Sequence, residues 1–263
     1  MLPALEIMHM LGYVHRDVSA GNILFWEDGG ILSDLESAKK TTDLSTHEVR
    51  TVCLLPCRVL HTPRSLFHDK GTNQYESVEV RQQRYLFRYK NYDEDGNYDE
   101  VEVPPPFKFN CIHDLESVWW IALWVLFHHA PVDDKEDRNV QILHALQMFP
   151  SVGSSMERLD AFVGEGVRDF IKDLAPTFRP IAKKLIDAVR LLIRCYIAAE
   201  KGPAINETAF NGLHQKLVVI LQEIRDMSQH INYKFVLPAK RGATEEPTSD
   251  RPGPSKRPRT GKS

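Results

Sequence analysis

The chain has 263 residues, 42% hydrophobic and 26% charged, which is ordinary for a soluble globular protein and enough for a sizeable core. A net charge of −3 gives no global attraction to nucleic acid, so we expect no nucleic-acid partner. The most apolar run, Val118 to Phe127, is about half as long as the ~20 residues that cross a bilayer. Without signal-peptide features at its start, the chain is expected to be intracellular, in the nucleus or cytoplasm, with no membrane partner.

The sequence of the first third of the chain predicts one helix and one β-hairpin. Apolar side chains recur at helical spacing before Gly12, at Leu2, Leu5, Met8 and Leu11, so an amphipathic helix is expected there. Two short apolar runs then flank EDGG at residues 27–30, a pattern typical of a β-hairpin. Residues 37–83 show no sustained periodicity.

A second hairpin is predicted at about residues 84–110, with its turn at Asp95-Gly96-Asn97 and three prolines closing it. The acidic residues of this turn do not have the spacing of an EF-hand, which favours a solvated hairpin tip over a calcium site. The rest of the folded part is predicted to be helical, over residues 114–127, 139–149, 180–199 and 207–227. The first of these helices is so apolar that its three tryptophans, Trp119, Trp120 and Trp124, are expected in the core.

Residues 1–236 are interpreted as one domain and residues 237–263 as a disordered basic tail. The tail is rich in Pro, Ser, Thr, Gly and charge and has almost no apolar side chains, so it cannot bury enough surface to fold. Its basic cluster, Lys256, Arg257, Arg259 and Lys262, is consistent with binding to a nuclear import receptor.

The segment His15 to Leu24, HRDVSAGNIL, carries residue types that phosphoryl transfer requires. That chemistry needs a carboxylate near the attacking hydroxyl and ligands for the metal ions that neutralise phosphate charge. Asp17 and Asn22 are suited to hold a base and a metal ligand on one rigid loop. Asp34, on the turn after the first hairpin, is a candidate ligand for a second metal ion.

In these motifs the chain resembles the eukaryotic protein kinases, and HRDVSAGN resembles their catalytic loop, which His15 and Arg16 open. The resemblance implies that Asp17 is the catalytic base and that Asn22 and Asp34 hold Mg²⁺ for ATP.

Three later segments are similar to kinase segments in the family's order. GTNQYESVEV (71–80) resembles the end of an activation segment, which implies that Thr72 lies near the catalytic aspartate and that Glu79 is the glutamate of the APE motif. HDLESVWWIALW resembles the buried helix whose first aspartate, here Asp114, anchors the catalytic loop. FRPIAKKL resembles the segment whose arginine, here Arg179, pairs with Glu79.

HRDVSAGNIL together with DLESVWWIALW is closest to the fungal-type protein kinase domain family, over roughly residues 2–235. The resemblance implies a mainly α fold, a kinase C-lobe made of a helical bundle with short β-hairpins. It also implies transfer of the ATP γ-phosphate to a serine or threonine of a protein substrate, whose identity the sequence does not indicate.

Several positions depart from the kinase pattern. Ser19 replaces a lysine that contacts the transferring phosphate, and Glu36 replaces the glycine of the DFG motif and adds a negative charge. Leu35 is expected to fill the apolar role of the DFG phenylalanine, and Val78 replaces the APE proline.

The glycine-rich loop, the strand lysine and the helix glutamate of a kinase precede the catalytic loop. The sixteen residues before Asp17 leave no room for them, so an N-terminal lobe is expected to be absent and the isolated chain to be weakly active or inactive. Two alternatives stay open, a non-catalytic pseudokinase that serves as an interaction module and a small-molecule phosphotransferase. The activation-segment resemblance speaks against the second, which needs no protein-substrate platform.

Overall fold

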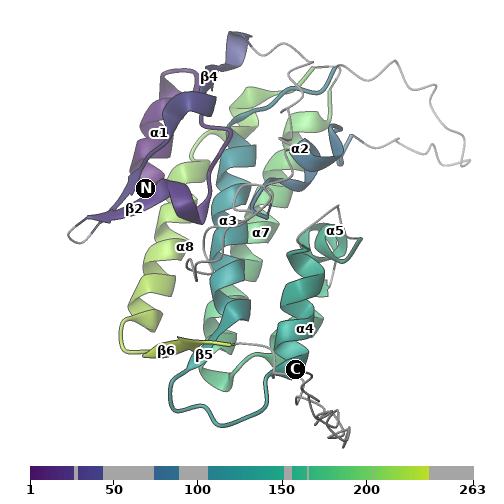
Figure 1. Cartoon of the computed structure of the whole chain (residues 1–263). Helices are drawn as coiled ribbons and strands as arrows, with labels where there is room; N and C mark the ends of the chain where they lie inside the picture. Colours follow the sequence, from purple (N-terminus) through teal and green to yellow (C-terminus); the bar gives the residue numbers. More distant parts are fainter. Residues whose placement is uncertain are drawn as a thin grey trace, which may run out of the picture.

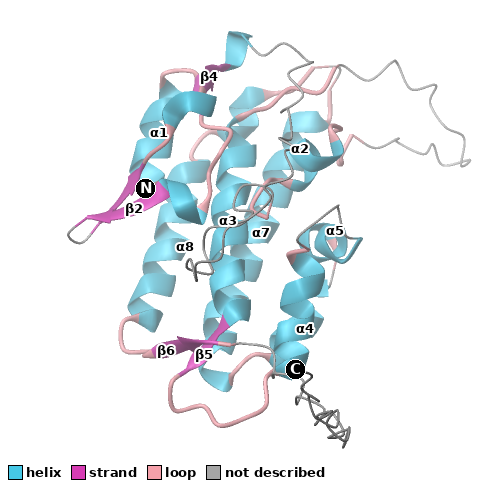
Figure 2. Cartoon of the chain, in the orientation of Figure 1, coloured by secondary structure: helices cyan, strands magenta, loops and turns pink. Residues whose placement is uncertain are grey.

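The computed structural model describes residues 1–26, 29–43, 74–88, 106–150, 156–164, 166–202 and 204–236. This part of the chain is mainly helical, with long helices lying side by side and short strands near their ends (Figures 1 and 2). The α-helices are α1 (Leu2–Met10), α2 (Val78–Gln82), α3 (Cys111–His128), α4 (Asn139–Met148), α5 (Met156–Val163), α6 (Gly166–Phe170), α7 (Arg179–Glu200) and α8 (Leu213–Ser228). The short 3-10 helices are η1 (Ala20–Asn22), η2 (Leu35–Ser37), η3 (Thr41–Asp43), η4 (Ile171–Asp173), η5 (Pro176–Phe178) and η6 (Glu207–Phe210).

Within the described residues, six short strands form three antiparallel pairs: β1 (Tyr13–Val14) with β4 (Lys39–Lys40), β2 (Ile23–Trp26) with β3 (Gly29–Leu32), and β5 (His129–Pro131) with β6 (Tyr233–Phe235). The pairing of β2 with β3 confirms the hairpin that the sequence predicts there. Its register places Ile23 opposite Leu32.

Helix α3 is the centre of the core and packs against α4 and α7. It begins at a capping box, in which the Asn110 side chain accepts from the helix backbone and His113 accepts from the Asn110 backbone. Trp119 and Trp120 are buried, and the Trp119 indole donates to the carbonyl oxygen of Leu185 in α7, at 2.8 Å. Trp124 is half-buried and stacks on His128. The predicted core role is therefore confirmed for Trp119 and Trp120, whereas Trp124 packs against the edge of the core.

One predicted helix is wrong in its extent. The segment expected as a single helix over 207–227 consists of η6 and α8, because Gly212 between them has a φ of +72°. This left-handed conformation costs glycine little and stops helix propagation. The second hairpin falls mostly on residues 89–105, and that part and the basic tail lie outside the described residues.

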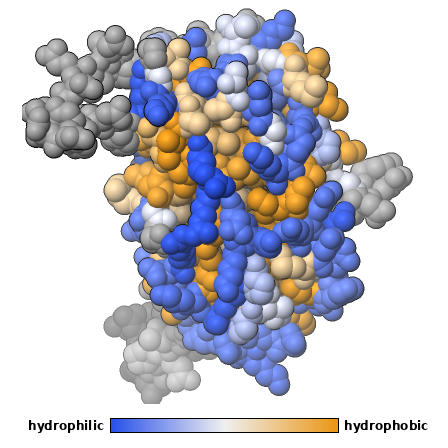
Figure 3. Space-filling model, turned by 180° about the vertical axis from the view of Figure 1, so that it is seen from behind, coloured by the Kyte–Doolittle hydropathy of each residue, from blue (hydrophilic) through white to orange (hydrophobic). Residues whose placement is uncertain are grey.

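Within the described residues no helix is both long enough and apolar enough to cross a bilayer. The surface nevertheless carries apolar patches among polar ones on the face opposite to the view of Figure 1 (Figure 3). Individual large apolar side chains such as Met10 and Leu143 are exposed.

Candidate functional site

The β2–β3 hairpin brings together two of the predicted site segments. β2 begins directly after Asn22, and β3 ends two residues before Asp34. Because the strands are antiparallel, Asn22 and Ser33 lie opposite each other, and the backbone N–H of Ser33 donates to the carbonyl oxygen of Asn22 at 2.8 Å. The Ser33 hydroxyl donates to the same oxygen at 3.1 Å. The predicted catalytic loop and the turn that carries Asp34 therefore share one end of this hairpin.

Inside the loop, the Asn22 side-chain N–H donates to the backbone oxygen of Asp17 at 2.9 Å. This bond fixes the orientation of the amide and leaves its oxygen as an acceptor. Arg16 and Asp34 both have left-handed backbone conformations, with φ of 69° and 59°, which non-glycine residues rarely adopt. Such residues cost free energy and persist where the surrounding structure determines them, a situation frequent at functional sites.

The fully buried His15 ring links the loop to the Asp34 turn. Its Nε2 lies 3.1 Å from the carbonyl oxygen of Ser33, and its Nδ1 accepts from the backbone N–H of Asp17 at 3.3 Å. A carbonyl oxygen only accepts, so Nε2 carries the hydrogen of this bond. His15 thus bonds to both segments at once.

Asp114, in the first turn of α3, holds the loop backbone from the other side. Its carboxylate accepts from the backbone N–H groups of His15 at 2.7 Å and Arg16 at 2.9 Å. The His9 ring of α1 also contacts it, at 2.9 Å from Nε2. The contact between Asp114 and the loop that the sequence predicts is present.

We expect Asp114→Asn to lower the free energy of unfolding by about 2 kcal/mol, because the new amide group would face a backbone N–H that loses its acceptor. Urea denaturation monitored by circular dichroism measures this. The exposed Asp187→Asn in α7, whose carboxylate faces Arg190 at 3.5 Å, is the matched control and should change stability by less than about 0.5 kcal/mol. Equal effects of the two substitutions would contradict the anchoring role.

The predicted ion pair between Arg179 and Glu79 is wrong. Arg179 is the first residue of α7, and its guanidinium donates to the carbonyl oxygens of Leu174, at 3.1 Å, and Lys172, at 2.7 Å. Glu79 is fully buried in α2 and lies 3.1 Å from His113 Nε2. Arg179 therefore hydrogen-bonds to the turns that precede its own helix and does not contact Glu79.

Arg158 of α5, which the sequence did not single out, holds the segment before α2. Its guanidinium is buried and donates to the carbonyl oxygens of Gln74 at 2.6 Å and Glu76 at 2.7 Å. It also lies 3.7 Å from the centroid of the Trp120 ring. The only signal in the sequence is that Arg158 precedes two apolar residues by three and four positions, which puts it on the buried face of a helix.

Glu116 of α3 is a second residue that sequence reasoning missed. It is fully buried and accepts three hydrogen bonds, from the Val78 backbone at 2.7 Å, the Trp120 indole at 2.9 Å and the Tyr196 hydroxyl at 2.7 Å. Burial raises the pKa of Glu116 above its usual value. The residue fastens α2 to α3 and α7.

The remaining predicted residues differ in how well their positions in the structure match the kinase pattern. Ser19 is buried, and its carbonyl oxygen accepts from the Asn22 backbone at 3.1 Å. Val78 is buried, as an apolar replacement for proline allows. Leu35 is 56% exposed, so the expectation that it packs like a DFG phenylalanine is wrong. Thr72 lies outside the described residues.

The described residues contain no group of three or more His, Cys, Asp or Glu side chains that could hold a metal ion. The predicted ligands Asn22 and Asp34 offer one amide oxygen and one carboxylate. Such oxygen donors are those that Mg²⁺ prefers, and Mg²⁺ commonly takes one or two carboxylates and completes its shell with water and substrate phosphates. The donor chemistry of the site therefore fits this ion.

Comparison with protein families gives a match over the first half of the chain. The family described as fungal protein kinase matches residues 3–126, a range that includes the catalytic-loop resemblance, Asp34, Glu79 and Asp114. Comparison with curated proteins finds no significant match, and neither does comparison with solved structures. Over residues 3–126 the chain is thus similar to the fungal protein kinase family.

Proposed function

We propose that this chain supplies the catalytic loop of a protein kinase that transfers the γ-phosphate of ATP to a serine or threonine hydroxyl of a protein. The observation that carries the proposal is the shared end of the β2–β3 hairpin, where the Asp17–Asn22 loop and the Asp34 turn are joined through Ser33. The family match over residues 3–126 supports it.

In this proposal Asp17 accepts the proton of the attacking hydroxyl, the role that a loop carboxylate has in phosphoryl transfer. Asn22 and Asp34 would hold Mg²⁺ together with the ATP phosphates. The ion would neutralise the charge that develops on the transferring phosphoryl group. His15, Asp114 and the Asn22–Asp17 bond hold the loop backbone and the Asn22 amide in position before substrate arrives, which lowers the cost of organising the site.

We further propose that these 263 residues by themselves turn over slowly. The sequence has one GxG, at Gly164–Gly166, and its second glycine begins α6, so that segment is used as a helix start. Without a glycine-rich cover and a lysine on the phosphates, electrostatic clamping and exclusion of water are weak, and these effects provide most of the rate in such reactions.

The test is a phosphotransferase assay on the purified chain with radiolabelled ATP, Mg²⁺ and a mixed serine/threonine peptide library. We expect slow, Mg²⁺-dependent transfer that Asp17→Asn and Asp34→Asn each reduce by about 100-fold. Asp187→Asn serves as the matched control and should leave the rate unchanged. Transfer that survives Asp17→Asn would exclude the assigned base, and rapid turnover of the isolated chain would overturn the expected weak activity.

One observation favours a second function, that of a non-catalytic interaction module. Leu35 and Glu36, which follow the proposed metal ligand Asp34, are both exposed, so an additional negative charge stands beside the site. Calorimetric titration with Mg-ATP distinguishes the two functions. Binding that is weakened by Asp34→Asn supports the kinase, and absence of nucleotide binding supports the interaction module.

A further inference from the structure

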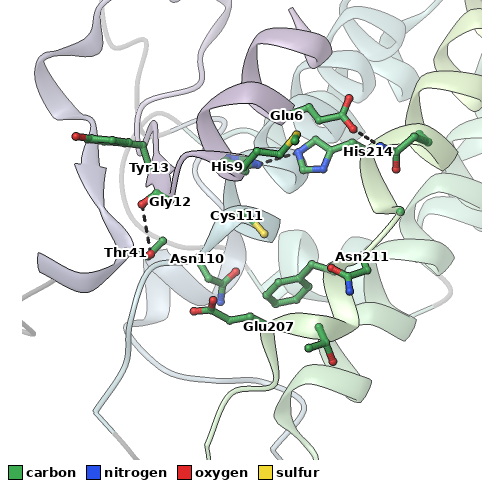
Figure 4. A pocket seen from close by; sticks show the side chains of 15 residues that line it. Glu6, His9, Gly12, Tyr13, Thr41, Asn110, Cys111, Glu207, Asn211 and His214 are labelled. Carbon is green, nitrogen blue, oxygen red and sulfur yellow. Dashed lines mark hydrogen bonds between the residues drawn. The ribbon is translucent and has the colours of Figure 1, made fainter.

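A cavity of about 410 Å³ lies between α1 and the η6–α8 segment, at the N-terminal end of α3. Its walls come from distant parts of the sequence and include Glu6, His9, Cys111, Glu207, Phe210 and His214 (Figure 4). None of the predicted catalytic residues lines it. The volume lies within the range of small-molecule sites, which combine an apolar surface with a few polar groups.

The charges of the lining residues favour a cation. Glu6 and Glu207 supply two carboxylates, and no lysine or arginine is among the described residues that line the cavity. The Glu6 carboxylate accepts from the Gln215 side chain, whereas Glu207 makes no hydrogen bond or ion pair within the described part of the chain. The buried Phe210 ring adds an aromatic surface, which attracts cations through its π face.

His214 does not offset these carboxylates. Burial, followed by the neighbouring His9, lowers the pKa of His214 to about 4, so the ring is neutral at pH 7. The cavity therefore carries net negative charge from its two glutamates. In a partly enclosed site such charge acts more strongly than at an open surface.

The cavity wall connects to the catalytic loop through two hydrogen-bonded histidines. His214 Nε2 lies 2.8 Å from His9 Nδ1, and His9 Nε2 lies 2.9 Å from Asp114 Oδ2. A carboxylate only accepts, so in neutral His9 the Nε2 atom carries the hydrogen and Nδ1 accepts from His214. Asp114 in turn accepts from the backbone N–H groups of His15 and Arg16. Three successive hydrogen bonds thus connect His214 to the backbone of the loop.

We propose that this cavity binds an organic cation with an amine or guanidinium head, and that its occupancy is transmitted through His214 and His9 to the catalytic loop. The head group would pair with Glu207, and the apolar part of the ligand would lie against Phe210. The same chemistry is offered by a free amine metabolite and by a lysine or arginine side chain of a peptide. The inference concerns binding and loop position and does not depend on phosphotransfer.

Binding is tested by calorimetry on the full chain without nucleotide, with benzylamine as the cation and benzyl alcohol as its neutral counterpart. We expect benzylamine to bind at least about tenfold more tightly, and Glu207→Gln to remove that preference. Glu157→Gln, which changes an exposed carboxylate of α5, is the control and should keep it. N-acetylarginine amide tests a peptide source, since tighter binding than benzylamine would indicate a side chain. Equal affinity for benzylamine and benzyl alcohol would overturn the site.

Transmission is tested by the amide chemical shifts of His15 and Arg16 in ¹⁵N-labelled protein. Saturating benzylamine should shift both signals, because the Asp114 carboxylate that they bond to moves with His9. In His214→Phe, which keeps an aromatic ring in the cavity wall but has no N–H, binding should persist while these shifts disappear. Loop shifts that persist in His214→Phe would exclude the histidine relay. The binding result would still stand, and neither outcome depends on catalytic activity.

Discussion

Replacing Arg158 with methionine is expected to lower the free energy of unfolding by about 3 kcal/mol or more. The guanidinium donates to the carbonyl oxygens of Gln74, Glu76 and Met148, and hydrogen bonds from charged groups contribute about 1.5–3 kcal/mol each. Methionine fills much of the volume beside Trp120, but it leaves these buried oxygens without a donor. Burial lowers the pKa of Arg158 to about 9, so the group is still charged at neutral pH.

The matched comparison is Arg179→Met. Arg179 also donates to two carbonyl oxygens, but it is exposed and water can replace its bonds, so we expect a loss within about 1 kcal/mol. Urea denaturation followed by tryptophan fluorescence measures both variants. A larger loss at Arg179 than at Arg158 would contradict the assignment of the buried Arg158 as the residue that holds the segment before α2.

The second large effect is a loss of stability as pH rises from about 7 to 9. The Glu79 and Glu200 carboxyl groups hydrogen-bond to each other, and burial raises the pKa of Glu79 to about 7 and that of Glu200 to about 9. The pair needs a proton in the folded state, whereas in the unfolded chain both groups ionise near pH 4.5. The folded state therefore binds more protons, and its stability falls as pH rises through the folded pKa values.

At lower pH, buried histidines make the folded state less stable as the pH falls. Burial lowers the pKa of His113 to about 4, so acid favours the unfolded chain below about pH 6.5. Above pH 7, the effect of the carboxyl pair on stability can be measured separately with Glu200→Gln. The glutamine amide can donate a hydrogen bond to Glu79 without a shared proton. We expect this variant to flatten the profile and to gain about 1 kcal/mol or more over the parent at pH 9.

Thermal denaturation at pH 7, 8 and 9 provides the measurement. Glu223→Gln is the control, because Glu223 pairs with Lys184 at the surface and its replacement should leave the slope of stability against pH unchanged. A Glu200→Gln profile parallel to that of the parent protein would show that the pair does not share a proton.

The sequence predicted those parts of the fold that depend on local pattern. Helices α1, α3, α4 and α7 were expected to within a few residues, because a long apolar repeat at helical spacing has few other solutions. The nearness of Asp34 to the Asp17–Asn22 loop was expected for the same kind of reason, since a hairpin returns the chain to its starting point.

Contacts between side chains that lie far apart in the sequence were not predictable. Arg158 and Arg179 are both arginines at helix starts, and only tertiary packing decides which one reaches the segment before α2. In the sequence, nothing distinguishes the buried Glu116 from a glutamate on the exposed face of a helix. The stop at Gly212 was missed because the apolar repeat continues on both sides of it, and a single left-handed glycine overrides that repeat.

The β2–β3 register has a consequence for how this protein can vary. The separation of the proposed base and metal ligand is set by the pairing of Ile23 with Leu32 and its neighbours, so extra residues between positions 26 and 29 would leave the chemistry untouched. Deleting one residue within either strand would slide the register and turn Asp34 to the opposite side of the ribbon. We therefore expect changes of length to be tolerated between the two strands and to disrupt the site when they fall within either strand.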